Sequence, residues 1–410
     1  MSSLIKKYIK IMTKICSLPW THLATHPHGG CTLCCIADHT HSASRAKNYD
    51  EEGKTVWLSL NNDSVDTIMN SDYYKDVRLK MLAGEEPAAC TRCYDEERTG
   101  LRSKRQEENE RYLDKIQDQI AATEADGTIP VSFRFIELRL GNVCNLQCRT
   151  CNPASSSKWV KEYAHLENKF DWVAKFGKVE RGQWFEADDF WQQLLERSSE
   201  VECIYINGGE PTLVEKHFVY LEKLIKAGIN HQVELWYNIN LTQIPGKLID
   251  LWSKFKKVKV SASIDDLFAR NDYIRYGSDW DVVYKNLMRL KNLSWIELGV
   301  MQTISAYSVP TLADFHKFFN DQGIQVHLNW CYDPPYLSPW ILPNDIKQKT
   351  IEDCRSVMNS WDHKNLEQHL TKIGDEHALE KFKVFTLELD GLRNEKFAEV
   401  FPDLNEALRW

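Results

Sequence analysis

Three cysteines stand close together in the run GNVCNLQCRTCNP, residues 141–153, where Cys144, Cys148 and Cys151 form a C-x3-C-x2-C pattern. Three thiolates on one loop can hold three irons of a cubane [4Fe–4S] cluster, which leaves the fourth iron without a protein ligand. Clusters that only transfer electrons have four cysteine ligands. A site with three cysteines is therefore suited to bind another molecule at the open iron.

Two other interpretations of the triplet are weaker. A structural zinc site needs four ligands, usually arranged as two pairs, and no fourth cysteine or histidine lies near this triplet. A disulfide framework fits less well, because three cysteines cannot all pair among themselves and the chain gives no sign of secretion. The pattern favours an iron–sulfur site, with zinc as the alternative.

The triplet resembles the signature of the radical S-adenosylmethionine (radical SAM) enzymes. The resemblance implies that the open iron chelates the amino and carboxylate groups of SAM. It also implies that an electron from the cluster splits the sulfonium to give a 5′-deoxyadenosyl radical. Family members usually carry an aromatic residue before the last cysteine, where this chain has Thr150. That departure concerns the packing expected around the SAM adenine.

Composition limits the class of protein. The chain has 410 residues, of which 43% are hydrophobic and 27% charged, as is ordinary for a globular protein. The net charge of −8 does not indicate a nucleic-acid partner. No apolar run is long enough to span a membrane. We expect a cytoplasmic protein whose twelve cysteines are more often metal ligands than disulfides.

From residue 133 onward, short apolar runs alternate with amphipathic ones, which is the pattern of βα units around a parallel sheet. The expected fold class is therefore α/β. Helices are expected between the strands, for example at residues 220–227 and 312–319. The resemblance specifies a six-stranded partial (β/α) barrel of the radical SAM type. The six expected strands span residues 133–140, 203–206, 233–237, 258–263, 298–303 and 324–328.

Further polar groups follow the later strands. Gly208, Gly209, Glu210 and Pro211 come after the second strand, where glycines let the backbone approach a ligand and a carboxylate can accept from an ammonium. This run resembles the family motif that holds the amino group of SAM. In isolation it would be an ordinary turn. The resemblance also implies SAM contacts at strand ends further along the chain, at Asn240, Ser263 and Asp265.

A second cysteine set precedes these strands. Cys90 and Cys93 form a C-x2-C pair, and with two distant cysteines they could ligate one metal. The set resembles the auxiliary-cluster modules, named SPASM or twitch, of radical SAM enzymes, here placed N-terminally. The resemblance implies a second [4Fe–4S] cluster on Cys16, Cys34, Cys90 and Cys93, with Cys35 or Cys31 as substitutes for Cys34. Zinc remains an alternative for an all-cysteine site.

The expected domains are an auxiliary module (1–100), a helical linker (101–128), the radical SAM core (129–343) and a C-terminal helical extension (344–410). The resemblance implies an enzyme that takes electrons from a flavodoxin or ferredoxin type of donor. It also implies hydrogen abstraction from a peptide or a carbohydrate-like small molecule. The alternative is a non-catalytic iron–sulfur or zinc protein that keeps the barrel as a scaffold.

Overall fold

The computed structural model describes residues 13–37, 44–170, 182–375 and 377–410. They form two compact units, each described here by itself. The first unit comprises the described residues of Met1–Asn142, Glu180–Trp236 and Asp250–Lys257. The second comprises those of Val143–Val179, Tyr237–Ile249 and Val258–Trp410.

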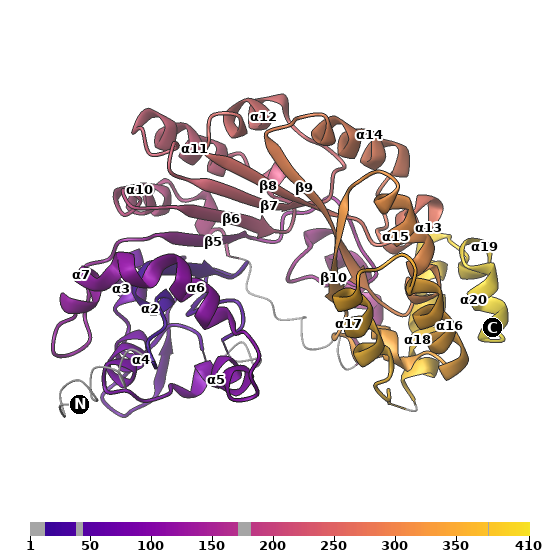
Figure 1. Ribbon diagram of the computed structural model, residues 1–410, viewed down its shortest axis with the longest axis horizontal. Coiled ribbons are helices and arrows are strands. Elements are labelled where there is room, and N and C mark those ends of the chain that lie inside the picture. Colours follow the sequence, from indigo (N-terminus) through magenta and orange to yellow (C-terminus); the bar gives the residue numbers. More distant parts are fainter. Residues whose placement is uncertain (1–12, 38–43, 171–181, 376) are drawn as a thin grey trace. The chain divides into compact units, whose positions relative to one another are not determined.

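The predicted α/β alternation is confirmed (Figure 1). All six predicted strands are present, with ends shifted by at most two residues, and each of the first five is followed by helix. The predicted helices at 220–227 and 312–319 correspond to α11 (Lys216–Lys226) and α15 (Leu312–Asn320). The strands are β5 (Phe135–Leu140), β6 (Cys203–Gly208), β7 (Glu234–Ile239), β8 (Lys257–Ser263), β9 (Ile296–Ile304) and β10 (Gln325–Trp330).

The sheet of the first unit is mostly parallel. Strand β5 pairs in parallel with β6, from Phe135 opposite Cys203 to Leu140 opposite Gly208. On its other side β5 pairs in parallel with β1 (His22–Thr25). The short β2 (Cys31–Thr32) then pairs with β1 in the antiparallel direction. Because parallel strands end at the same edge, the chain segments that follow β5 and β6 start side by side.

The second unit contains the parallel strands β8, β9 and β10. In β8, buried Val258, Val260 and Ala262 alternate with half-buried polar residues, as expected for a strand with one face on the core. Two helices, α13 (Phe268–Ile274) and α14 (Trp280–Lys291), connect β8 to β9, and α15 lies between β9 and β10.

The N-terminal part of the first unit surrounds a buried arginine. Arg78, on α4 (Asp72–Leu82), is fully buried, and its guanidinium donates to the carbonyls of Gly127, Pro19 and Met69 at 2.8, 3.0 and 2.9 Å. Burial without these acceptors would cost several kcal/mol. The same part contains α2 (Leu18–Thr21), α3 (Val65–Met69), α5 (Thr91–Arg98) and the hairpin of β3 (Lys47–Tyr49) and β4 (Thr55–Trp57).

The region predicted as a helical linker contains three consecutive helical segments. The segments are α6 (Lys104–Tyr112), the 3-10 turn η2 (Leu113–Ile116) and α7 (Gln117–Ala121). Ser103 and Gln106 form a capping box that fixes the start of α6. Ile116, at the end of η2, is fully buried.

The C-terminal extension is helical, as its sequence pattern predicts. It contains α16 (Asn344–Cys354), α17 (Ser360–Leu370), α18 (Ala378–Arg393), α19 (Phe397–Val400) and α20 (Pro402–Ala407). Its aromatic side chains share one core with residues of the turn after β9, for example Phe382 with Tyr307 at 4.8 Å between ring centroids. Within the described ranges, no helix combines the length and apolarity that crossing a membrane requires.

Candidate functional site

The cysteine triplet lies on a loop of the second unit that directly follows β5 in the chain. Cys148 is buried, and Cys144 and Cys151 are half-buried. Burial, partly offset by the guanidinium of Arg275, raises the pKa of the Cys148 thiol to about 11, and the neighbouring Cys144 contributes to this rise. Burial also raises the pKa of Cys151, as do Cys148 and Cys144. The three thiols are thus close enough to influence one another's ionisation, and a metal that binds them must displace their protons.

Backbone hydrogen bonds hold the loop against the segment after β8. The amides of Gln147 and Arg149 donate to the carbonyls of Tyr276 and Ile274 at 2.9 and 2.7 Å. The carbonyl of Cys148 accepts from the indole Nε1 of Trp159 at 3.0 Å. These bonds fix the backbone on both sides of Cys148, although the loop has no regular secondary structure.

A buried ion pair lies beside the thiols. Arg275 Nη1 donates to Asp265 Oδ2 at 3.0 Å, and the side chain of Asp265 is 1% exposed. The guanidinium of Arg275 counteracts the effect of burial on the pKa values of Cys148 and Cys151. Arg275 is thus a fixed positive charge next to three groups that become anionic thiolates on binding metal. It is a site residue that the sequence analysis did not identify.

Two of the predicted SAM contacts take part in internal hydrogen bonds. Asp265 Oδ1 accepts from the amide of Thr303 at 2.9 Å, so both of its carboxylate oxygens have protein donors. Asn240 Nδ2 donates to Oδ1 of Asn145, within the cysteine loop, at 2.9 Å. Asn240 Oδ1 accepts from the amide of Thr242 at 3.0 Å. Ser263 is half-buried at the end of β8. Asn240 and Asp265 therefore help to hold the loop and Arg275 in place.

The predicted Gly208–Pro211 motif belongs to the first unit. Gly208 has a φ of +127°, and a Cβ atom there would come within 2.6 Å of the amide nitrogen of Leu140. Glycine is therefore required at this position for the close approach of β5 and β6. The amide of Gly209 donates to the carbonyl of Gly141 at 3.1 Å. The motif thus begins at a point where a side chain would collide with the backbone of β5.

Glu210 is almost fully buried, with 1% of its surface exposed. Its Oε1 accepts from the amide and the hydroxyl of Thr212 at 3.1 and 2.7 Å. These bonds cap the 3-10 turn η5 (Pro211–Leu213). The carboxylate is thus held in one orientation by groups of its own turn.

The N-terminal cysteines form a second cluster of thiols, in the first unit. Cys16, Cys34, Cys90 and Cys93 line one small pocket together with Lys104 and Arg105. The pKa of Cys16 is raised to about 12, chiefly by burial and in part by the neighbouring Cys93. Burial is also the main cause of the raised pKa of Cys34 and Cys90, with Cys16 adding to both. The four residues predicted as one ligand set are therefore neighbours.

The two substitutes considered for Cys34 are placed elsewhere. Cys31 is fully buried beside Arg45, and its thiol faces the carbonyl of Gly29 at 4.0 Å. Cys35 is exposed, and the charges near it are those of Glu137 and Lys104. Neither Cys31 nor Cys35 lines the pocket of the other four cysteines.

Two cations border this pocket at the start of α6. Arg105 is held by Glu97 through two bonds of 2.9 and 2.5 Å, and its Nη1 donates to the carbonyl of Ile15 at 2.7 Å. Lys104 donates to Glu108 at 2.9 Å. Positive charges at this place would favour the anionic, thiolate form of the site.

The arrangement of the thiols bears on which metal they suit. Among the residues that the structure describes, no three His, Cys, Asp or Glu side chains converge closely enough to hold one metal ion. A single zinc ion needs such convergence, with sulfur atoms about 2.3 Å from the metal. A four-iron cubane needs less, because each cysteine binds a different iron.

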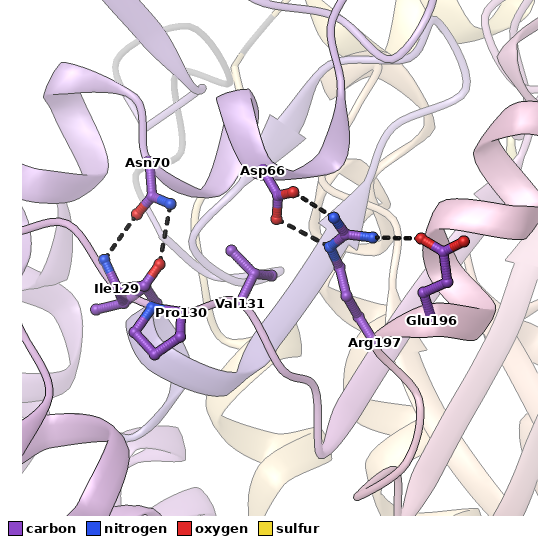
Figure 2. Close-up of a pocket in the computed structure, with 7 residues that line it drawn as sticks. All are labelled: Asp66, Asn70, Ile129, Pro130, Val131, Glu196 and Arg197. Carbon is purple, nitrogen blue, oxygen red and sulfur yellow. Dashed lines mark hydrogen bonds and ion pairs between the residues drawn. The ribbon is translucent and has the colours of Figure 1, made fainter.

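A larger groove, of about 430 Å³, lies elsewhere in the first unit (Figure 2). Its charged residues bind one another: Arg197 contacts both carboxylate oxygens of Asp66, and its Nη1 lies 3.5 Å from Glu196. Asn70 pairs with both the amide and the carbonyl of Ile129, at 3.0 and 3.1 Å. None of the predicted site residues lines this groove, and its polar groups serve to hold the segment after the linker in place.

Several solved structures are similar to the chain, some of them with bound AdoMet, which is SAM. One is native anSMEcpe with bound AdoMet and Cp18Cys peptide, at 17% identity and a TM-score of 0.38, over 60% of this chain and 63% of that one. Another is Streptococcus suis SuiB bound to precursor peptide SuiA, at 11% identity and a TM-score of 0.31, over 86% of this chain and 70% of that one. The chain thus spans less than two thirds of the anSMEcpe chain, and at such TM-scores neither likeness carries an argument about function.

The family comparison concerns the N-terminal cysteines. No curated protein matches the sequence. A family model does match residues 16–94, and its description is SPASM, iron–sulfur cluster-binding domain. The match includes Cys16, Cys34, Cys90 and Cys93, and it confirms the predicted resemblance of this module. Residues 16–94 are therefore similar to the SPASM family of iron–sulfur cluster-binding domains.

Proposed function

We propose that this chain is a radical SAM enzyme with one auxiliary iron–sulfur cluster. The observation that carries the proposal is the arrangement of Cys144, Cys148 and Cys151. Their thiols influence one another's ionisation on a single loop, beside the buried guanidinium of Arg275. Three thiolates and one fixed cation suit a four-iron cubane that keeps one iron open. The SPASM match supports iron–sulfur chemistry in the same chain.

The residues have distinct roles in this proposal. Cys144, Cys148 and Cys151 would hold the catalytic [4Fe–4S] cluster, which with SAM bound supplies a 5′-deoxyadenosyl radical. The carboxylate of Glu210 would bind the ammonium of SAM through a charge-assisted hydrogen bond. The backbone at Gly208, Gly209 and Pro211 would orient the same end of SAM, and Ser263 would contact it from the end of β8.

Asn240 and Asp265 would act mainly through other residues. Asn240 holds Asn145 of the cysteine loop, and Asp265 holds Arg275 beside the thiols. We propose that both set the position of the cluster and the charge around it. Such outer partners are commonly as necessary as the ligands themselves.

The auxiliary cluster would be bound by Cys16, Cys34, Cys90 and Cys93. Four cysteines complete the ligation of a four-iron cluster, so this cluster would have no open iron for a substrate. It would therefore serve in electron transfer or in stabilising the module. Cys34 is favoured over Cys31 and Cys35 because it alone of the three lines the shared pocket.

The reaction would be hydrogen abstraction from a peptide or a carbohydrate-like small molecule, with electrons from a flavodoxin or ferredoxin type of donor. The expected domain limits at residues 100, 128 and 343 belong to the same proposal. The alternative function is a non-catalytic iron–sulfur or zinc scaffold. The intact run of Gly208, Gly209 and Glu210 argues against it, because a scaffold has no need of a site for the amino group of SAM.

Anaerobic reconstitution followed by addition of SAM and dithionite tests the function. The parent protein should produce 5′-deoxyadenosine, and a variant with Cys144, Cys148 and Cys151 all replaced by alanine should not. A reconstituted parent that binds iron but produces no 5′-deoxyadenosine would support the scaffold instead. Zinc in place of iron in the purified protein would do the same.

A further inference from the structure

Arg149, between the second and third cysteines of the loop, extends into the C-terminal extension. Its side chain is fully buried. Nη2 donates to Asp390 Oδ1 at 2.6 Å and to Glu395 Oε2 at 2.8 Å. Nη1 donates to the carbonyl of Thr386 at 3.4 Å. All three acceptors lie on α18 or directly after it, more than 230 residues along the chain from Arg149.

The acceptor carboxylate is itself held in place. Asp390 Oδ1 also accepts from the hydroxyl of Tyr273 at 2.6 Å, and Oδ2 accepts from the amide of Phe397 at 2.6 Å. The guanidinium of Arg149 lies over the ring of Tyr273, 3.6 Å from its centroid, and Nε donates to the carbonyl of Tyr273 at 3.1 Å. The network therefore joins the loop, the segment after β8 and α18.

A second arginine joins the same helix to the loop on the other side of Cys148. Arg393, the last residue of α18, donates from Nη2 to the carbonyl of Gln147 at 2.9 Å. It also binds both carboxylate oxygens of Glu162, at 3.1 and 2.7 Å. The ring of Trp159, whose indole donates to the carbonyl of Cys148, lies 5.1 Å from this guanidinium.

Two buried arginines thus attach the residues on either side of Cys148 to one helix. Burying charge is costly unless each group is paired, so the two attachments are specific: few other positions of the loop would satisfy them. Partners outside a metal's ligands typically change metal affinity 10- to 100-fold when they are removed. A loop without regular structure depends on such attachments to keep its thiols in place.

We propose that Arg149 and Arg393 are positioning residues that dock the cysteine loop on α18, so that the C-terminal extension controls retention of the catalytic cluster. This inference rests on the proposed function, since it assumes a cluster on the loop. It assigns a role to the extension, whose sequence carries no motif. It also gives Asp390 a role as the residue that receives Arg149.

Arg149→Met and Asp390→Asn test the docking directly. Methionine keeps most of the length of arginine and removes its charge and donors. Lys347→Met is the matched control: Lys347 is a buried cation of the same extension that donates to the carbonyls of Trp340 and Lys372 at 3.3 and 3.2 Å. Iron content, the rate of iron loss to a chelator and the spectrum of the reduced cluster are measured for each reconstituted protein.

We expect Arg149→Met and Asp390→Asn to lose iron from the catalytic site 10- to 100-fold faster than the parent. The auxiliary site should keep its iron, and Lys347→Met should behave as the parent at both sites. Folded Arg149→Met protein with the parent's rate of iron loss and the parent's spectrum would overturn the proposal. A parent whose iron content does not fall when the three loop cysteines are replaced would instead contradict the proposed function.

If the variants do not fold, amide hydrogen exchange on the unmodified protein tests whether α18 and the cluster stabilise each other. Thermodynamic coupling is reciprocal. If contact with α18 stabilises the cysteine loop with its cluster bound, then binding of the cluster must also stabilise α18. Amides of residues 386–395 should exchange at least about tenfold more slowly in the reconstituted protein than in the metal-free protein. Those of α16 should change little. Equal exchange of 386–395 in both forms would overturn the proposal.

Discussion

Asp265 binds Arg275 through a hydrogen bond of 3.0 Å between Oδ2 and Nη1, and both side chains are largely buried, at 1% and 12% exposure. The other carboxylate oxygen of Asp265 is held by the amide of Thr303. The guanidinium therefore has little freedom to move, and it lies beside Cys148 and Cys151. This fixed charge is the main electrostatic feature of the cysteine loop.

Asp265→Asn should leave Arg275 without its counter-charge. Removing one partner of a buried ion pair costs about 3–5 kcal/mol of stability. The uncompensated cation should also make the nearby cluster easier to reduce, which a redox titration followed by electron paramagnetic resonance measures as a less negative midpoint potential. Asp266→Asn is the control, because Asp266 is equally buried but pairs with Arg270 at 2.9 Å. Equal potentials for the two variants would exclude a role of Asp265 in tuning the cluster.

Cys148→Ala should abolish production of 5′-deoxyadenosine and leave the protein folded. Cys148 lies on a loop, so its loss removes a ligand with little effect on the core. Cys354→Ala is the matched control, since Cys354 is a fully buried thiol of α16 that lines neither thiol site. Parent-like 5′-deoxyadenosine from Cys148→Ala, or a loss equal to that of Cys354→Ala, would mean that Cys148 is not a ligand of the catalytic cluster.

Glu210→Gln should keep the cluster and weaken SAM binding about tenfold, because a charge-assisted contact becomes a neutral one worth about 1–2 kcal/mol less. Glutamine keeps the Oε1 that caps η5, so the turn should survive. Glu210→Ala removes the cap as well and should cost about a further 1 kcal/mol of stability. Titration of the cluster's spectrum with SAM gives the affinity; an unchanged value for Glu210→Gln would remove the carboxylate from the site.

The proposal of two clusters predicts the number of iron atoms bound per chain. If both sites hold four-iron cubanes, the parent should contain about eight irons per chain, and the variant without Cys144, Cys148 and Cys151 about four. Cys34→Ala in that variant should remove most of the remaining iron, whereas Cys35→Ala should not. One zinc per chain in place of the remaining iron would identify a structural zinc site instead and leave the catalytic assignment untouched.

The order of the strands and the place of the cysteine loop were predictable because they depend on local patterns. Runs such as 258–263 alternate between core and polar residues, and turn residues separate them. The thiol sets were predictable for a similar reason, since cysteines at ligand spacing are rare and chemically specific. The 3-10 turn η2 within the linker was not, because residues 113–116 contain no glycine or proline that would mark an interruption.

The charges around the loop were not predictable. Arg149 and Arg275 look like any surface arginine in the sequence, and only the fold brings Asp390 to Arg149, 241 positions away. Distant pairs of this kind carry no periodic signal, so a single sequence cannot reveal them.

Electron–nuclear double resonance on the reduced protein with SAM labelled by ¹⁵N at its amino group tests the central claim most directly. If the loop of Cys144, Cys148 and Cys151 holds a cluster with one open iron, the reduced cluster should show a hyperfine coupling to the ¹⁵N nucleus. The coupling should be absent from the variant without the three cysteines, which retains the auxiliary site. A reduced parent that binds SAM and shows no ¹⁵N coupling would contradict the account.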